Sequence, residues 1–159
     1  MNPFFDSNDP YYNPEHWSLL SKNGFITFVK YFFMGQIYAD LILANPAKEN
    51  LQAIKANALV DTGALFLCIP AHIALQLQLT EYEKREVTIA DGSKKLVPYV
   101  GPVKINYLNR MCLTGALVLG EMVLLGAIPI EDMDLVIHPA QLSITVNPNN
   151  PNIAGALVM

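Results

Sequence analysis

Apolar and polar residues alternate along two stretches in the first half of the chain, and this alternation predicts two β-strands. An extended chain points successive side chains to opposite faces, so apolar residues at every second position form one buried face. The pattern covers residues 37–43, which are followed by the turn formers Asn45 and Pro46, and residues 53–60, which are followed by Asp61. The buried faces are expected to comprise Ile37, Ala39, Leu41 and Leu43 in the first stretch, and Ile54, Ala56, Ala58 and Val60 in the second.

Short apolar segments separated by turn signals continue as far as residue 146. Asp91-Gly92 is a strong hairpin signal, and Asn109-Arg110 marks a second reversal. Pro70 suits the first turn of a short helix over residues 71–78, and a second short helix is expected over residues 128–133. Further strands are predicted over residues 66–69, 86–90, 95–100, 103–108, 111–119, 123–126, 135–137 and 142–146. Many short strands without strand–helix alternation predict an all-β barrel or sandwich with one or two short helices.

Three parts of the chain differ in character. Residues 1–33, rich in aromatic residues and turn formers, are interpreted as an N-terminal extension that is partly without fixed structure. Residues 34–147 carry the regular pattern and form the predicted domain, which is long enough to bury a core without disulfides. Prolines and asparagines then interrupt regular structure, so residues 148–159 are interpreted as a C-terminal tail.

The composition and charge of the chain argue against several classes of protein. Apolar residues make up 52% of the chain and charged residues 15%, a balance typical of folded chains and not of disordered ones. The net charge is -4 and no stripe of lysine and arginine could follow phosphates, which argues against nucleic acid as a partner. Cys68 and Cys112 lie in apolar runs and are expected to be free buried thiols, although one disulfide stays open. Free thiols suit a reducing, cytoplasmic compartment.

No metal and no cofactor are expected. His16, His72 and His138 are far apart, and neither cysteine shows the short ligand spacing of zinc sites. His72 is expected on the surface of the first short helix.

A group of acidic residues near residue 132 has two interpretations. Glu131, Asp132 and Asp134 could form a second carboxylate or cation site. We prefer the interpretation that, with Pro129, they form the start and surface of the second short helix, where acids favour the positive end.

The N-terminal part argues against a membrane protein. Residues 1–14 lack the basic start and apolar block of a secretory signal. Residues 24–35 include Lys30 and are far fewer than the roughly 20 apolar residues that a spanning helix needs. Attachment to a membrane surface through residues 25–33 stays as a minor alternative, because that run shows no clear polar helical face.

Asp61 is the candidate catalytic residue. An apolar strand leads into it and apolar residues resume at Ala64, so its carboxylate enters a hydrophobic neighbourhood where it needs compensating contacts. Thr62 supplies a hydroxyl that can hold the loop, and Gly63 lets another backbone or a ligand approach closely. The alternative is that Asp61 only forms the turn by accepting a hydrogen bond from its own backbone.

Over residues 34–148 the chain resembles the retropepsin-like aspartic peptidases, the family of the retroviral proteases and their cellular single-domain relatives. The resemblance rests on Asp61-Thr62-Gly63-Ala64, on the hairpin through Ala90-Asp91-Gly92, and on Leu124-Leu125-Gly126 with the short helix that follows. It implies a closed β-barrel that acts as a homodimer, with Asp61 and its symmetry mate as the catalytic pair. It also implies a grip between subunits by Thr62, contacts of Gly63 and Ala64 with the substrate backbone, and support of the loop by Leu124, Leu125 and Gly126.

The hairpin over residues 87–103 is the candidate flap, with Ala90, Asp91 and Gly92 expected to contact a polypeptide substrate bound as an added strand. Pro98 is expected to restrict it, because proline donates no ladder hydrogen bond. The sequence therefore predicts an aspartic endopeptidase. The alternative is a dimer of the same fold without turnover that binds peptides.

Overall fold

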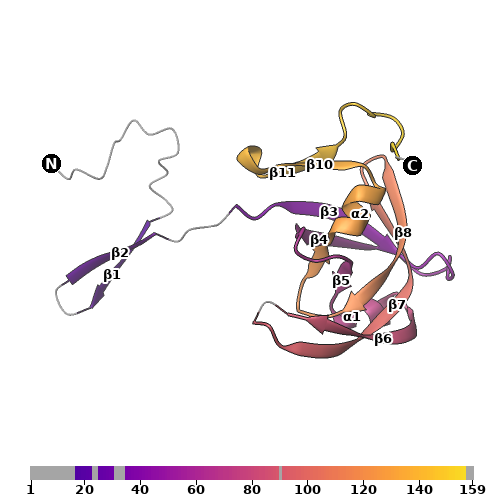
Figure 1. The fold of residues 1–159 in the computed structure, drawn as a ribbon, viewed down its shortest axis with the longest axis horizontal. Coiled ribbons are helices and arrows are strands. Elements are labelled where there is room, and N and C mark those ends of the chain that lie inside the picture. The colour runs from indigo at the N-terminus through magenta and orange to yellow at the C-terminus, as the bar shows by residue number, and fades with distance from the viewer. Residues whose placement is uncertain (1–16, 23–24, 31–34, 90, 157–159) are drawn as a thin grey trace. The chain divides into compact units, whose positions relative to one another are not determined.

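The computed structural model describes residues 17–22, 25–30, 35–89 and 91–156, and the chain divides into two units, residues 1–34 and 35–159 (Figure 1). The first unit contains an antiparallel hairpin of β1 (Trp17–Lys22) and β2 (Phe25–Lys30). Our sequence analysis assigned no strand there. Residues 25–29 are mainly β-branched and aromatic, a composition that favours a strand. Residues 31–33 of the segment considered for membrane attachment lie outside the described residues.

The second unit is an all-β barrel. Its strands are β3 (Tyr38–Ala44), β4 (Ile54–Val60), β5 (Leu67–Ile69), β6 (Thr80–Thr88), β7 (Lys94–Tyr107), β8 (Arg110–Val118) and β9 (Val123–Leu125). The order β3-β4-β9-β5-β8-β7 closes on itself because β3 also pairs with β7, from Ile42 opposite Asn106 to Ala44 opposite Lys104. Six strands therefore form a closed barrel, and β6 is attached only to β7. The prediction of a closed all-β barrel is confirmed.

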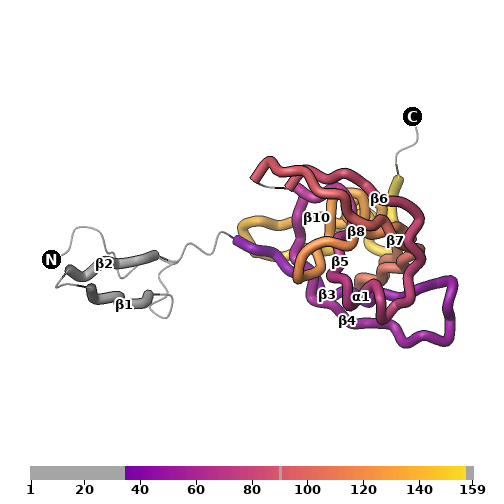
Figure 2. The backbone as a smooth tube through the Cα atoms, turned by 90° about the horizontal axis from the view of Figure 1, so that it is seen from below, coloured from indigo at the N-terminus to yellow at the C-terminus, as the bar shows by residue number. Residues whose placement is uncertain are grey.

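Two short α-helices lie in this unit, as expected: α1 (Ala71–Gln76) and α2 (Ala127–Asp132). His72 is exposed on α1, as predicted. After α2, the strands β10 (Leu135–His138) and β11 (Ser143–Val146) form a separate antiparallel pair, joined through the 3-10 helix Pro139–Gln141. Figure 2 shows the barrel from a second direction, with the β6–β7 hairpin along one side.

Alternate residues of the strands fill the barrel. The predicted inward face of β3 is confirmed, since Ile37, Ala39, Leu41 and Leu43 are all buried. On β4, Ala58 is buried, while Ile54, Ala56 and Val60 are partly buried and pack against the same core. A second, smaller apolar cluster lies between the hairpin and the barrel. It is built around Cys68, Val97 and Leu117, with Phe66, Val87, Tyr99, Leu119 and Leu124 packed against it.

Strands β6 and β7 are longer than the sequence pattern predicted. The expected strand over residues 86–90 begins six residues earlier, at Thr80, and ends at Thr88. Most side chains of β6 are exposed, and apolar residues do not alternate along it, so the sequence gives no strand pattern over its first part. The two strands expected over residues 95–100 and 103–108 are one strand, because an irregularity in register between Val100 and Val103 absorbs the Gly101-Pro102 pair.

Pro98 is accommodated within the hairpin without ending either strand. It lies within β7 opposite Lys84 of β6. On the other side of β7, strand β8 pairs only from Tyr99 onward. Pro98 therefore occupies a position where one side of the strand has no partner, and its missing N–H breaks no second ladder.

The acidic residues near residue 132 lie at the opposite end of α2 from the one predicted. Glu131 and Asp132 are in its last turn, and its first turn contains no acidic residue. The helix begins at Ala127 because Gly126 provides the extended residue before it, so Pro129 falls within the helix. Asp134 follows the helix with a positive φ of 51°. The favourable charge–dipole interaction that we expected is therefore absent at this helix.

Candidate functional site

Asp61 directly follows β4, at a point where two parallel strands end together. Strand β4 pairs in parallel with β9, with Leu59 opposite Leu124 and Val60 opposite Leu125. The backbone N–H of Asp61 continues this ladder by donating to the carbonyl oxygen of Leu125 at 3.0 Å. Leu125 is fully buried, so Asp61 starts its loop from a rigid part of the barrel.

The loop closes around the Asp61 carboxylate. The N–H of Gly63 donates to Asp61 Oδ1 at 2.9 Å, and the N–H of Ala64 donates to the Asp61 carbonyl at 3.1 Å. The first of these bonds is the local turn that the purely structural interpretation of Asp61 requires. It uses one carboxylate oxygen, and within the described residues Asp61 Oδ2 accepts no hydrogen bond. Asp61 itself is half-buried.

Helix α2 supports the loop from the other side. The N–H groups of Ala127 and Ile128 donate to the carbonyl oxygens of Ala64 and Leu65 at 2.9 and 3.0 Å. Gly126 makes this approach feasible, because a Cβ atom there would lie 2.8 Å from the Ala64 carbonyl oxygen and closer still to that of Phe66. Leu125 and Gly126 thus lie beneath the loop, where support residues were expected.

A pocket of about 650 Å³ opens beside Asp61. Its walls come from the Asp61 loop, from β5, β8 and β9, and from the end of β6, and they are mainly apolar. The lining residues are Asp61, Gly63, Ala64, Leu65, Phe66, Cys68, Val87, Thr88, Ile89, Leu117, Leu119 and Leu124. The pocket therefore brings together Asp61, Gly63, Ala64 and Leu124 of the predicted site, while the exposed Thr62 is not part of its lining.

The candidate flap reaches this pocket through its strand and not through its tip. Val87, Thr88 and Ile89 line the pocket, whereas Asp91 and Gly92 are exposed at the turn and do not. Ala90 lies outside the described residues.

The turn itself is well bonded. Ile89 N–H donates to Ser93 O at 2.9 Å and Gly92 N–H to Ile89 O at 2.8 Å, with Gly92 at a φ of 82° that suits glycine. Hydrogen bonds from Ser93 hold the pKa of Asp91 below its usual value. Asp91 and Gly92 thus shape the turn, and the strand residues before it face the pocket.

Cys68 belongs to the pocket, although the sequence indicated only a buried thiol. Burial, and secondly the negative charge of Asp61, raise the pKa of the Cys68 thiol. The thiol therefore stays neutral at pH 7 and forms part of the apolar wall next to the carboxylate. Both cysteines are free and buried. Leu65 and Phe66, which follow the Asp61 loop, and Leu117 and Leu119, at the end of β8, also line the pocket and were not named from the sequence. The closeness of the β8 residues to Asp61 follows from barrel closure and not from local spacing.

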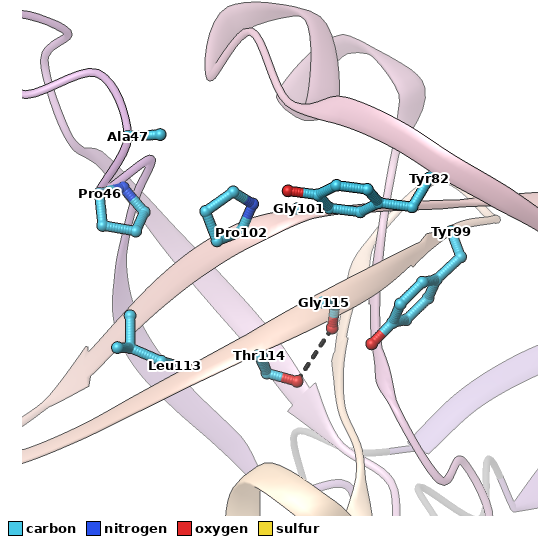
Figure 3. A pocket seen from close by; sticks show the side chains of 9 residues that line it. All are labelled: Pro46, Ala47, Tyr82, Tyr99, Gly101, Pro102, Leu113, Thr114 and Gly115. Atoms are coloured by element: carbon cyan, nitrogen blue, oxygen red, sulfur yellow. Dashed lines mark hydrogen bonds between the residues drawn. The ribbon is translucent and has the colours of Figure 1, made fainter.

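A second pocket, of about 520 Å³, shares no residue with the first (Figure 3). The rings of Tyr82 and Tyr99 and two prolines line it, and no charged side chain contributes to it. Figure 3 shows the Thr114 hydroxyl, which donates to the carbonyl oxygen of Gly115 at 3.0 Å. This pocket has an apolar lining without a carboxylate, histidine or cysteine, so it does not offer the carboxylate chemistry expected of Asp61.

The described residues contain no group of three or more histidine, cysteine, aspartate or glutamate side chains placed to hold a metal ion. Among them, no helix is long and apolar enough to cross a membrane.

Comparisons with known proteins give similarities of structure and none of sequence family. No family model matches the chain, and no curated protein matches it. Among solved structures, the chain is similar to one described as the solution structure of simian foamy virus (mac) protease. The identity is 15%, the match covers 60% of this chain and 90% of the viral one, and the TM-score is 0.37. A similarity at this level assigns no activity to this chain.

Proposed function

We propose that this protein is an aspartic endopeptidase in which two copies of Asp61, one from each subunit of a homodimer, activate a water molecule against a peptide bond. The observation that carries the proposal is the position of Asp61 at an apolar pocket, with Oδ1 held by Gly63 N–H and Oδ2 free of hydrogen bonds from the described residues. A role of Asp61 in the turn alone does not account for the pocket of about 650 Å³ beside its carboxylate.

One chain supplies one such carboxylate, so the chemistry requires two. When two carboxylates meet across a two-fold axis, repulsion between like charges leaves one proton shared between them. The ionised group then removes a proton from water, and the protonated group donates its proton to the carbonyl oxygen of the substrate. As the C–N bond breaks, the carboxyl that took the proton from water donates it to the leaving amine, and the other carboxylate takes back a proton from the collapsing gem-diol. The pair titrates as a unit, and its two apparent pKa values belong to neither copy alone.

The residues after Asp61 have proposed roles in dimer contact and in substrate binding. Thr62 is exposed beside Asp61, where its hydroxyl can bond the partner subunit. Gly63 and Ala64 present backbone at the pocket. An extended peptide would lie between this loop and the end of β6, with its side chains in the apolar part of the pocket. The substrate is therefore a polypeptide with apolar side chains near the cleaved bond.

Asp61→Asn tests the mechanism directly. The amide keeps the acceptor oxygen for Gly63 N–H but cannot share a proton, so kcat/KM on a peptide library should fall by about 10³-fold or more. Asp40→Asn is the matched control, because Asp40 is an exposed aspartate whose Oδ1 accepts a hydrogen bond from Asn57 at 2.8 Å, away from the pocket. Cleavage that survives Asp61→Asn would refute the mechanism.

A mixing experiment separates the peptidase from a silent peptide-binding dimer. Because each active dimer needs two intact Asp61 side chains, excess Asp61→Asn chain should suppress wild-type activity by forming mixed dimers. If wild-type protein binds peptides but cleaves none between acidic and neutral pH, the binding module becomes the better account.

A further inference from the structure

A stacked arginine links the β6–β7 hairpin to the wall of the Asp61 pocket. The guanidinium carbon of Arg85 lies 3.6 Å from the centroid of the Tyr99 ring and 4.9 Å from that of Phe66. The two rings meet edge to face, with centroids 5.8 Å apart and planes at 66°. A cation over two aromatic faces is held by electrostatic attraction to the ring quadrupoles. Sequence reasoning missed this cluster, because its three members are 14 or more positions apart.

The surrounding structure sets the positions of both rings. Phe66 lines the Asp61 pocket and follows the catalytic loop into β5. Tyr99 lies on β7 and packs on β8 at Gly115, where a Cβ atom would overlap the ring, with Tyr99 Cε1 2.8 Å away. Figure 3 shows the Tyr99 ring next to Gly115. Arg85 therefore stacks on one ring that belongs to the barrel and one that belongs to the pocket wall.

The strand that carries Arg85 has few other attachments. Among the described strands, β6 pairs with β7 alone, and most of its side chains are exposed. Arg85 and Val87 are half-buried, while the residues between and after them are exposed, so these two side chains share the inner face. Val87 lines the pocket. The position of the pocket-lining end of β6 thus depends on how firmly its inner face is held.

The salt bridge of Arg85 contributes less than the stacking. Its Nε donates to Glu83 Oε1 at 2.6 Å, and the side chains are 33% and 53% exposed, so solvent weakens the attraction. Glu83 lies on the same strand, so this pair orients the guanidinium but does not bind β6 to the barrel. The contacts with Phe66 and Tyr99 are the ones that cross between elements.

We propose that Arg85 is a positioning residue for peptide binding: by stacking on Phe66 and Tyr99 it holds Val87 and Ile89 at the distance from the Asp61 loop that an extended substrate requires. This role rests on the proposed function. Arg85 acts through the pocket wall and leaves the chemistry to Asp61.

Arg85→Met tests the role by separating KM from kcat. Methionine keeps an apolar stem without the cation, so KM for a peptide substrate should rise about fivefold while kcat stays within about twofold. Arg85→Lys, which restores the charge but not the planar guanidinium that stacks on the rings, should recover only part of the loss. Lys94→Met is the matched control, because Lys94 forms a similar exposed ion pair on this hairpin, 2.7 Å from Glu86, without contacting the aromatic pair. An unchanged KM in Arg85→Met, or an equal rise in Lys94→Met, would overturn the proposal.

Hydrogen exchange tests the same role without any catalysis. In Arg85→Met the amides of Ile89 and Gly92, both bonded within the turn, should exchange about fivefold faster than in wild type, whereas the Asp61 amide bonded to Leu125 should be unaffected. Equal exchange at the turn would contradict the proposal even if Asp61→Asn abolishes cleavage. If instead Asp61→Asn retains cleavage, the proposed function fails while the exchange result still shows whether Arg85 holds the hairpin.

Discussion

A side chain at position 126 would collide with two backbone carbonyls of the Asp61 segment, those of Ala64 and Phe66. Backbone cannot move aside as a flexible side chain can, so this glycine controls how closely α2 approaches the loop. Sequence reasoning identified Gly126 by resemblance, and the geometry supplies the reason for a glycine there. The expected role of Thr62 depends on a partner subunit, and it stays a prediction.

Gly126→Ala should lower the free energy of unfolding by about 1–3 kcal/mol, because α2 must shift away from the loop to accommodate the methyl group. It should also lower peptidase activity, since Ala127 and Ile128 lose their bonds to the loop. Urea unfolding at pH 7 measures the first effect. Gly101→Ala is the control, because its Cβ atom would have no heavy atom nearer than 3.5 Å. Equal losses of stability in the two variants would contradict this account.

At the scale of elements, the segment after β11 is held to the barrel more firmly than the interpretation as a tail suggests. Asp134 accepts hydrogen bonds from the Asn147 and Asn150 side chains at 2.8 and 2.7 Å and from Gly155 N–H at 2.8 Å. The buried Arg110 donates to the Asn150 carbonyl, and Asn109 donates to that of Pro151 at 2.9 Å. Prolines and asparagines end the strand here, and the asparagines also supply the donors.

Asp134→Asn should loosen this segment and lower the melting temperature by a few degrees at neutral pH. Hydrogen bonds, first from Gly155 and then from Asn147 and Asn150, hold the pKa of Asp134 below its usual value. Because the folded-state pKa is lowered, the ionised carboxylate stabilises the folded protein at pH values above the unfolded-state pKa of about 3.9. This stabilisation is lost as the pH falls through the folded-state pKa. Wild type and variant should therefore converge in strong acid.

Glu131→Gln is the control for this experiment, because Glu131 is exposed and its side chain has no hydrogen-bond or ion-pair partner among the residues that the structure describes. Thermal unfolding followed by circular dichroism from pH 7 down to about pH 2 gives the comparison. A difference between wild type and Asp134→Asn that does not change with pH would show that the charge of Asp134 is not involved.

At the scale of the whole molecule, the barrel over residues 35–159 contains its own buried core. Such a core predicts independent folding. The proposed chemistry adds that two copies must associate, because one chain offers a single Asp61.

A shortened chain starting at Met34 should therefore fold, have twice the chain mass in solution, and retain the peptidase activity of the full chain. Light scattering measures the mass, and activity per chain should rise with protein concentration as dimers form. An active, strictly monomeric species would refute the two-carboxylate mechanism. Loss of folding would instead show that residues 1–33 belong to the domain.

The sequence by itself determined the strand faces, the two helices, the turn at Asp91-Gly92 and the position of Asp61 directly after a strand, because each depends on spacing between near neighbours. Tertiary structure decided the rest. The pocket, the place of Cys68 beside Asp61 and the stacking of Arg85 on Phe66 and Tyr99 arise from barrel closure, which joins distant segments. The first part of β6 was missed, because its exposed residues leave little apolar pattern. The acids of α2 were placed at the wrong end of the helix, because contacts with neighbouring segments set where a helix begins.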